Sequence, residues 1–376
     1  MNTYYSQLAR LLEERTPIDK EGYFVLCEGN IAKYSLTKPV DIETITAERF
    51  VDALVEGCKV AIESFASSSD NKEIYVFNLY ADEHNCFYIY INTLDSFKKT
   101  LESYPKRRGS YEISTLKYNQ GDFGFQLWQE HMGVHGQIVE SFENLAELVS
   151  YSEQESFSDD DVPIIAFEAG ILKSGFQLLA IKAVLRLISD NAFESLNTTE
   201  NFIAFAATGD DYIDYSIVMR KSISSELLYE IFPDIREKDI QFNEEMKKNQ
   251  YLSVNEYLDY WSYTMNSNSR LKTPFSYFKS EIEVYIQMEH FGDALAQECL
   301  ERINKILDVE DLERKDYDHI YFYVEALHFS GKLTEEQLKD CSIIADRMIT
   351  RSVDDDDGLQ ETSQELMFFV NQCPLR

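Results

Sequence analysis

Residues Glu73–Pro105 have the sequence EIYVFNLYADEHNCFYIYINTLDSFKKTLESYP, and the rest of the chain is best interpreted from this segment. Apolar residues alternate along Ile74–Tyr80 and again along Phe87–Ile91, a pattern typical of strands that bury one face. The acidic turn Ala81–Asn85 lies between them and is typical of a hairpin loop. A helix is expected over Asp95–Tyr104. The stretch therefore predicts a strand, a turn, a second strand and a helix.

The same order of elements recurs at Asn201–Pro233, NFIAFAATGDDYIDYSIVMRKSISSELLYEIFP, which aligns with the first stretch without a gap. Phe77 then meets Phe205, and Asp82 in the first turn meets Asp210 in the second. Because repeats change the architecture of a whole chain, we interpret this one first, as a duplicated module. The alternative is that two unrelated units of the same element order align by chance.

The length of 376 residues favours two to three domains. We predict an α+β protein of two tandem related modules, each a mostly antiparallel sheet flanked by helices, followed by a C-terminal helical extension. The first module is expected at residues 1–151 and the second at 163–307. Residues 152–162 form a polar, acidic linker without apolar periodicity. Residues 308–376 form the helical extension.

Several local signals refine this organisation. Thr46 is expected to cap a helix that begins at Ala47, and Thr334 opens a capping box before a late helix. The apolar runs on either side of Glu28-Gly29-Asn30 predict a hairpin. A further strand is expected over Tyr111–Tyr118.

The composition restricts the possible partners and the compartment. A net charge of −32 should repel nucleic acid and anionic membranes and should attract a basic protein. High solubility is the alternative reason for such a charge. The first residues contain charges and no apolar core, so no signal peptide is expected. The apolar segment Phe176–Ile188 contains two basic residues and is too short to span a bilayer.

The cysteine pattern also favours a reducing cytoplasm. The six cysteines show no paired spacing, and several lie inside apolar runs. A disulfide framework is not expected in a chain this long with so few cysteines. The six residues are Cys27, Cys58, Cys86, Cys299, Cys341 and Cys373.

No motif in the chain predicts catalysis. His131 and His135 have the spacing that places two imidazoles on one helical face, but no third ligand is near and the glutamate of a zinc protease is absent. We interpret them as surface or half-buried histidines. Glycine-rich phosphate loops are also missing. We therefore predict no catalytic residues, no metal and no cofactor.

Acidic clusters are the candidates for binding a partner. Complementary charge speeds the encounter of two proteins, and apolar anchors then hold the complex. The alternative interpretation is structural, because charge runs are usually solvated and turn aspartates bond their own backbone. The candidate residues are Asp82, Glu83, Asp159, Asp160, Asp161, Asp210, Asp211 and Asp214.

The repeated hairpin resembles a bacterial family known as domain of unknown function 4303. The resemblance depends on the strand Ile74–Tyr80, the acidic turn after it, and the Asn92-Thr93 pair before the next helix. A later Phe291-Gly292-Asp293 inside a helix also fits the family pattern.

The resemblance covers the chain in two parts. The first runs from about Phe50 to Gln126, and a looser second part runs from about Phe176 to Ile306. The second part departs from the pattern in having Arg220-Lys221 where the first has Asn92-Thr93. None of the shared motifs is catalytic, so no active-site residue is implied. Families of this kind often lie beside polymorphic toxin genes, and the resemblance therefore implies an immunity protein.

The leading hypothesis is a cytoplasmic binding protein, an immunity protein that blocks a basic toxin domain sterically and electrostatically, without turnover. The first alternative is an enzyme of unrecognised type with its site between the two modules. The second is an acidic scaffold or nucleic-acid mimic. A toxin gene beside its own would favour the first hypothesis, a bound metal or cofactor the enzyme, and salt-sensitive binding to many basic proteins the scaffold.

Overall fold

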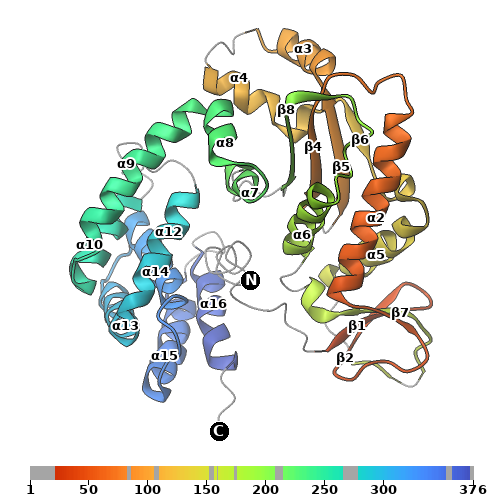
Figure 1. The fold of residues 1–376 in the computed structure, drawn as a ribbon. Coiled ribbons are helices and arrows are strands. Elements are labelled where there is room, and N and C mark those ends of the chain that lie inside the picture. Colours follow the sequence, from red (N-terminus) through yellow and green to blue (C-terminus); the bar gives the residue numbers. More distant parts are fainter. Residues whose placement is uncertain are drawn as a thin grey trace. The chain divides into compact units, whose positions relative to one another are not determined.

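Figure 1 shows the computed structural model of the chain. It describes residues 22–82, 86–105, 110–151, 156–158, 160–172, 176–207, 215–265, 278–352 and 358–372. The chain divides into two compact units. We call residues 14–236 the α/β unit, and residues 237–376 with residues 1–13 the helical unit.

The first sheet of the α/β unit has the strand order β2-β1-β7-β3. Strand β1 (Tyr23–Cys27) pairs antiparallel with β2 (Ile31–Ser35) on one side and with β7 (Pro163–Glu168) on the other. Strand β3 (Glu43–Ile45) runs parallel to β7. The sheet therefore joins residues from the start of the chain to residues of the predicted second module.

The second sheet has the strand order β6-β5-β4-β8. Strands β4 (Ile74–Ala81) and β5 (Phe87–Thr93) form the antiparallel hairpin predicted from the sequence. Strand β6 (Phe125–Leu127) pairs antiparallel with β5. Strand β8 (Thr198–Ala207) runs parallel to β4 and ends the sheet on the other side.

Helices flank these two sheets (Figure 1). In the α/β unit they are α2 (Ala47–Ala66), α3 (Leu94–Ser103), α4 (Ser110–Lys117), α5 (Gly136–Tyr151), α6 (Phe176–Ser189), α7 (Tyr215–Ser222) and α8 (Ser225–Ile231), with short 3-10 helices η1 (Gln120–Asp122) and η2 (Gln129–His135).

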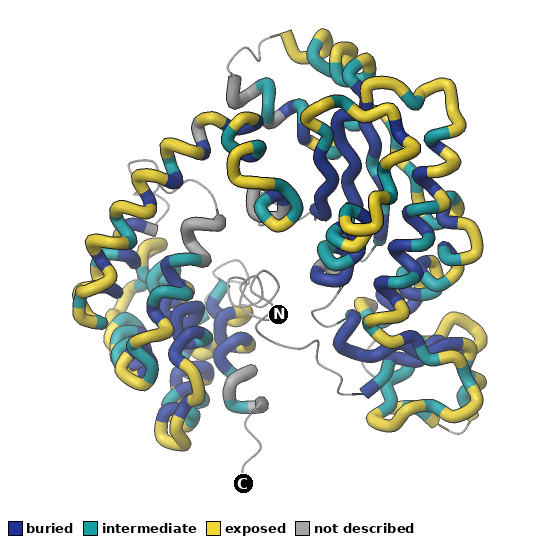
Figure 2. The backbone as a smooth tube through the Cα atoms, viewed as in Figure 1, coloured by how far each residue is buried: buried dark blue, intermediate teal, exposed yellow. Residues whose placement is uncertain are grey.

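Helix α2 is the centre of the core in the α/β unit. The side chain of its N-cap residue Thr46 accepts a hydrogen bond from the Arg49 backbone N–H at 3.2 Å, as the sequence predicted. The buried ring of Phe50 contacts Phe87 of the second sheet and Phe167 of the first, with ring centroids 5.5 and 6.3 Å apart. One aromatic side chain therefore packs against both sheets, and Figure 2 shows the buried residues along their strands.

The helical unit contains no strand among its described residues. Its helices are α9 (Pro233–Asn249), whose first residues lie in the α/β unit, α10 (Val254–Met265), α12 (Phe278–Met288), η4 (Glu289–Phe291), α13 (Asp293–Leu307), α14 (Arg314–Leu327), α15 (Glu335–Arg351) and α16 (Leu359–Gln372). The capping box predicted at Thr334 is confirmed, because its hydroxyl accepts from the Gln337 N–H at 3.3 Å and its own N–H donates to the Gln337 side chain at 2.8 Å.

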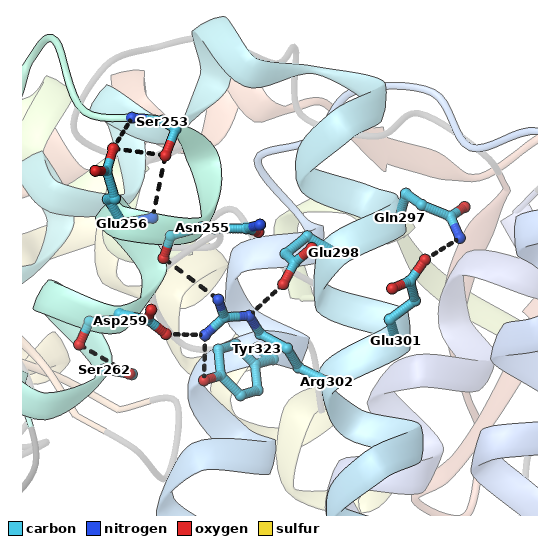
Figure 3. Close-up of polar contacts among 10 residues, drawn as sticks. All are labelled: Ser253, Asn255, Glu256, Asp259, Ser262, Gln297, Glu298, Glu301, Arg302 and Tyr323. Carbon is cyan, nitrogen blue, oxygen red and sulfur yellow. Dashed lines mark hydrogen bonds and ion pairs between the residues drawn. The ribbon is translucent and has the colours of Figure 1, made fainter.

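Arg302 connects three helices of this unit (Figure 3). Its guanidinium donates to Glu298 on its own helix α13 at 2.7 Å and to Asp259 on α10 at 2.5 Å. It also donates to the Tyr323 hydroxyl on α14 at 3.2 Å. Only 15% of the Arg302 side chain is exposed, so the charge is partly desolvated and depends on these partners. We interpret this network as structural.

The α+β class and the helical C-terminal region are confirmed. The strands, however, are not arranged as two tandem modules with a linker at 152–162. Strand β7 lies between β1 and β3, and β8 pairs with β4, so residues after the predicted linker complete both sheets. The structure also places the division of the chain between residues 236 and 237 rather than at 152–162 or 307.

Two predicted strands are helices. Tyr111–Tyr118 was expected to be a strand, and the structure has helix α4 there. The second strand of the repeated hairpin falls in helix α7. Both are short runs in which apolar residues fit either period, so the sequence pattern alone does not separate helix from strand. No helix in the described ranges is long and apolar enough to cross a membrane.

Candidate binding site at the β4–β5 hairpin

Three tyrosines lie together on one face of the second sheet. Because side chains alternate along a strand, Leu79 and Ile89 face the core, and Tyr80, Tyr88 and Tyr90 face the other way. The ring centroids are 6.1 Å apart between Tyr80 and Tyr88, 5.6 Å between Tyr80 and Tyr90, and 6.1 Å between Tyr88 and Tyr90. All three are half-buried. We call them the tyrosine cluster.

Asp82 follows β4 and closes the hairpin. Its carboxylate accepts a hydrogen bond from the Cys86 N–H at 2.8 Å, and its own N–H donates to the Cys86 carbonyl at 3.0 Å. Only 8% of Asp82 is exposed. These bonds are those of a turn aspartate, so Asp82 holds the turn next to the tyrosine cluster.

Glu143 reaches the same hairpin from helix α5. Its carboxylate accepts from the Phe87 N–H at 2.8 Å. Burial raises the pKa of Glu143 to about 7, and the negative charges of Asp82 and Glu140 act in the same direction. The bond from Phe87 opposes this shift, because it stabilises the charged form. Glu143 therefore changes its protonation near neutral pH.

Sequence reasoning missed Glu143. Its signal was weak but present, because Val139, Glu143 and Ala146 follow one another at helical spacing and the two apolar residues are fully buried. A glutamate within such a row has part of its side chain in the core. Its contact with Phe87, far away in the sequence, is visible only in the structure.

Cys86 is a poor nucleophile at neutral pH. Burial, together with the charges of Asp82 and Glu143, raises the pKa of its thiol to about 11. A hydrogen bond with Tyr88 lowers it by less. Since the thiolate is the reactive form of cysteine, this site holds a protonated thiol.

The other predicted acidic residues are only partly described. Asp161 accepts bonds from the Ser158 N–H and hydroxyl, both at 2.9 Å, and these bonds lower the pKa of its carboxyl. Asp160 is exposed in the same turn. This turn precedes β7 of the first sheet, whereas Asp82 follows β4 of the second. The candidates outside the described residues are Glu83, Asp159, Asp210, Asp211 and Asp214.

The histidine pair does not have the helical geometry its spacing suggested. His131 and His135 lie in η2, where Gly133 has φ 60° and ψ −140° and interrupts the helix. The His131 Nδ1 accepts from the Trp128 N–H at 3.3 Å. Within the described ranges, no group of three or more histidine, cysteine, aspartate or glutamate side chains could hold a metal ion.

Residues 54–223 match the model of a family described as "Domain of unknown function (DUF4303)". This supports the resemblance seen in the sequence over those residues. The single match begins within α2 and ends just after α7, so it includes β4–β5 and β8 together. No curated protein and no solved structure is significantly similar to the chain.

Proposed function

We propose that this chain is a cytoplasmic, non-catalytic binding protein, an immunity protein that neutralises a basic toxin by covering its functional surface. The observation that carries the proposal is the tyrosine cluster beside Asp82 in a chain with a net charge of −32. The immunity role itself comes from the resemblance noted in the sequence, because the family that matches residues 54–223 is described as a domain of unknown function.

The chemistry of the tyrosine cluster suits a protein interface. Tyrosine offers a large contact area with few rotatable bonds, and its hydroxyl tolerates both water and a partner. Acidic surroundings attract a basic protein and raise the rate of association. Tyr80, Tyr88 and Tyr90 would supply the apolar contact, and the surface charge would guide the partner to it.

The test is a pull-down of the tagged chain from lysate of its own cells at low and moderate salt, with mass spectrometry. We expect one stoichiometric basic partner that remains bound at moderate salt. Tyr88→Lys should weaken its binding by about a hundredfold, the loss typical of a central interface aromatic. Tyr251→Lys is the matched control, because Tyr251 is 86% exposed in the helical unit.

Two results would contradict the proposal. Absence of any partner at both salt concentrations would remove its basis. Capture of many basic proteins that all dissociate in moderate salt would instead indicate an acidic scaffold or nucleic-acid mimic.

One observation favours a second candidate function, an enzyme. A carboxyl with a pKa of about 7 is suited to proton transfer at neutral pH. Glu143 would then act as a general acid or base beside the tyrosine cluster. A screen of small-molecule substrates tests this, with Glu143→Gln as the inactive control. Turnover that survives this substitution would exclude Glu143 from the chemistry.

A further inference from the structure

A groove of about 540 Å³ lies beside strand β8 in the α/β unit. Its walls come from the end of α6 and the segment after it, from β8 itself, and from the junction of α7 and α8, which Figure 1 shows close to β8. The walls are largely apolar. The apolar side chains that line the groove include Ile188, Phe193, Phe202, Ile223 and Leu227.

The groove runs along the end of a sheet. In the strand order β6-β5-β4-β8, β8 has a partner on one side, and no further described strand lies beyond it. Thr198, Glu200 and Asn201 in its first half are exposed. The end strand of a sheet is a template on which an extended peptide can add another strand through main-chain hydrogen bonds.

The rim of the groove is acidic. Glu194 lines it directly, Glu200 lies on β8 between the lining residues Thr198 and Phe202, and Glu226 precedes Leu227. All three glutamates are exposed. One positive charge lies close to the groove in the sequence, because the exposed Lys221 precedes the lining residue Ser222. The rim therefore favours a positively charged ligand.

We infer that this groove binds an extended segment of a partner protein in which apolar side chains alternate with lysine or arginine. The segment adds a strand beside β8. Successive side chains of a strand point to opposite faces, so its apolar side chains enter the groove while its basic side chains reach the glutamates. This deepens the proposed function, because it names the part of the basic partner that the chain holds.

The groove also limits the length of this segment. The lining residues of β8 lie between Thr198 and Ala204, where its pairing with β4 is irregular, because Thr198 pairs with Ile74 and Ile203 with Val76. The regular strand edge beside the groove is therefore short, and the segment pairs over only a few residues. A helical ligand would contradict this inference, because the backbone of a helix cannot pair with the edge of a strand.

The experiment uses a displayed library of random octapeptides, selected on the full chain and, in parallel, on Leu227→Arg. We expect the wild-type selection to enrich peptides that alternate apolar and basic residues. An enriched peptide is then synthesised with and without N-methyl groups on alternate amides. N-methylation should weaken binding about tenfold or more, because it removes the N–H donors that pair with β8.

Variants test the apolar wall and the acidic rim separately. Leu227→Arg and Glu200→Lys should each weaken the enriched peptide about tenfold. Glu200 is exposed, so Glu200→Lys keeps the test valid if Leu227→Arg fails to fold. The matched controls are Leu36→Arg, an apolar residue that is 79% exposed, and Glu63→Lys, an exposed glutamate of α2. Neither control should change binding.

Three outcomes overturn the inference. These are no enrichment over Leu227→Arg, enrichment of acidic or helix-forming peptides, and binding that N-methylation leaves unchanged. The inference and the proposed function can fail separately. If the partner from the pull-down binds Leu227→Arg and Glu200→Lys normally, the groove is not its binding site, and the immunity proposal still stands. If peptides bind the groove but no cellular partner is found, the groove inference stands and the immunity proposal is refuted.

Discussion

Replacing Glu143 with glutamine should stabilise the α/β unit at alkaline pH and leave its stability almost unchanged near pH 4.5. The pKa of this carboxyl is raised from 4.5 to about 7, first by burial and then by the charges of Asp82 and Glu140. Glutamine has nearly the same shape, and its amide oxygen can still accept the bond from the Phe87 N–H. The substitution therefore removes the charge and keeps the contact.

The sign and size follow from the pKa shift. Between pH 4.5 and about 7 the folded state holds the Glu143 proton more tightly than the unfolded state, so the free energy of unfolding falls as pH rises. Each unit of pKa shift corresponds to about 1.4 kcal/mol. Because the side chain keeps some contact with water, we expect Glu143→Gln to gain roughly 2–3 kcal/mol above neutral pH.

The assay is hydrogen–deuterium exchange of peptides that contain β5, near pH 5 and near pH 8, corrected for the intrinsic rates. The amide of Phe87 is among those measured. Glu147→Gln is the control, since Glu147 is exposed one turn further along α5. Equal opening free energies for wild type and Glu143→Gln near pH 8 would refute the reasoning, and so would the same gain at both pH values.

Three further predictions concern packing, charge and reactivity. Gly57→Ala should destabilise the chain by about 1–3 kcal/mol in urea unfolding, because the new Cβ would lie 2.8 Å from the Met132 Cβ. In a double-mutant cycle, Met132→Gly, which removes that Cβ, should offset part of this loss, and additive losses would contradict the contact. Arg302→Met should cost the helical unit about 2–4 kcal/mol in thermal unfolding, whereas Lys315→Met, in an exposed ion pair, should leave the unfolding temperature nearly unchanged. Alkylation of Cys86 by iodoacetamide should be slow at neutral pH and accelerate toward pH 11, because the pKa of its thiol is about 11. Peptide mass spectrometry measures the rate, and fast alkylation at neutral pH would contradict this prediction.

The candidate site was only partly accessible from the sequence. The hairpin and Asp82 were predicted, because alternation and turn chemistry depend on neighbouring residues. That Tyr80, Tyr88 and Tyr90 form one cluster follows from the register of β4 with β5. Glu143 could not be placed there in advance, since its environment depends on the packing of α5 against a hairpin distant in the sequence.

The local features of this protein could be predicted from its amino-acid sequence. The β4–β5 hairpin, the cap at Thr46 and the capping box at Thr334 are fixed by residues a few positions apart. The acidic charge needs only the composition. Each of these depends on short-range bonding or on summed charge, which a sequence shows directly.

Tertiary structure alone decided how the pieces combine. The pattern of β8 resembles β4, which suggested a second module, yet β8 pairs with β4 in one sheet. Strand β7 likewise completes the first sheet instead of beginning a new one. An apolar strand requires a partner for its backbone and cover for its face, but its pattern does not name the partner. That choice depends on which segments bury the most apolar surface together, and it also created the groove beside β8.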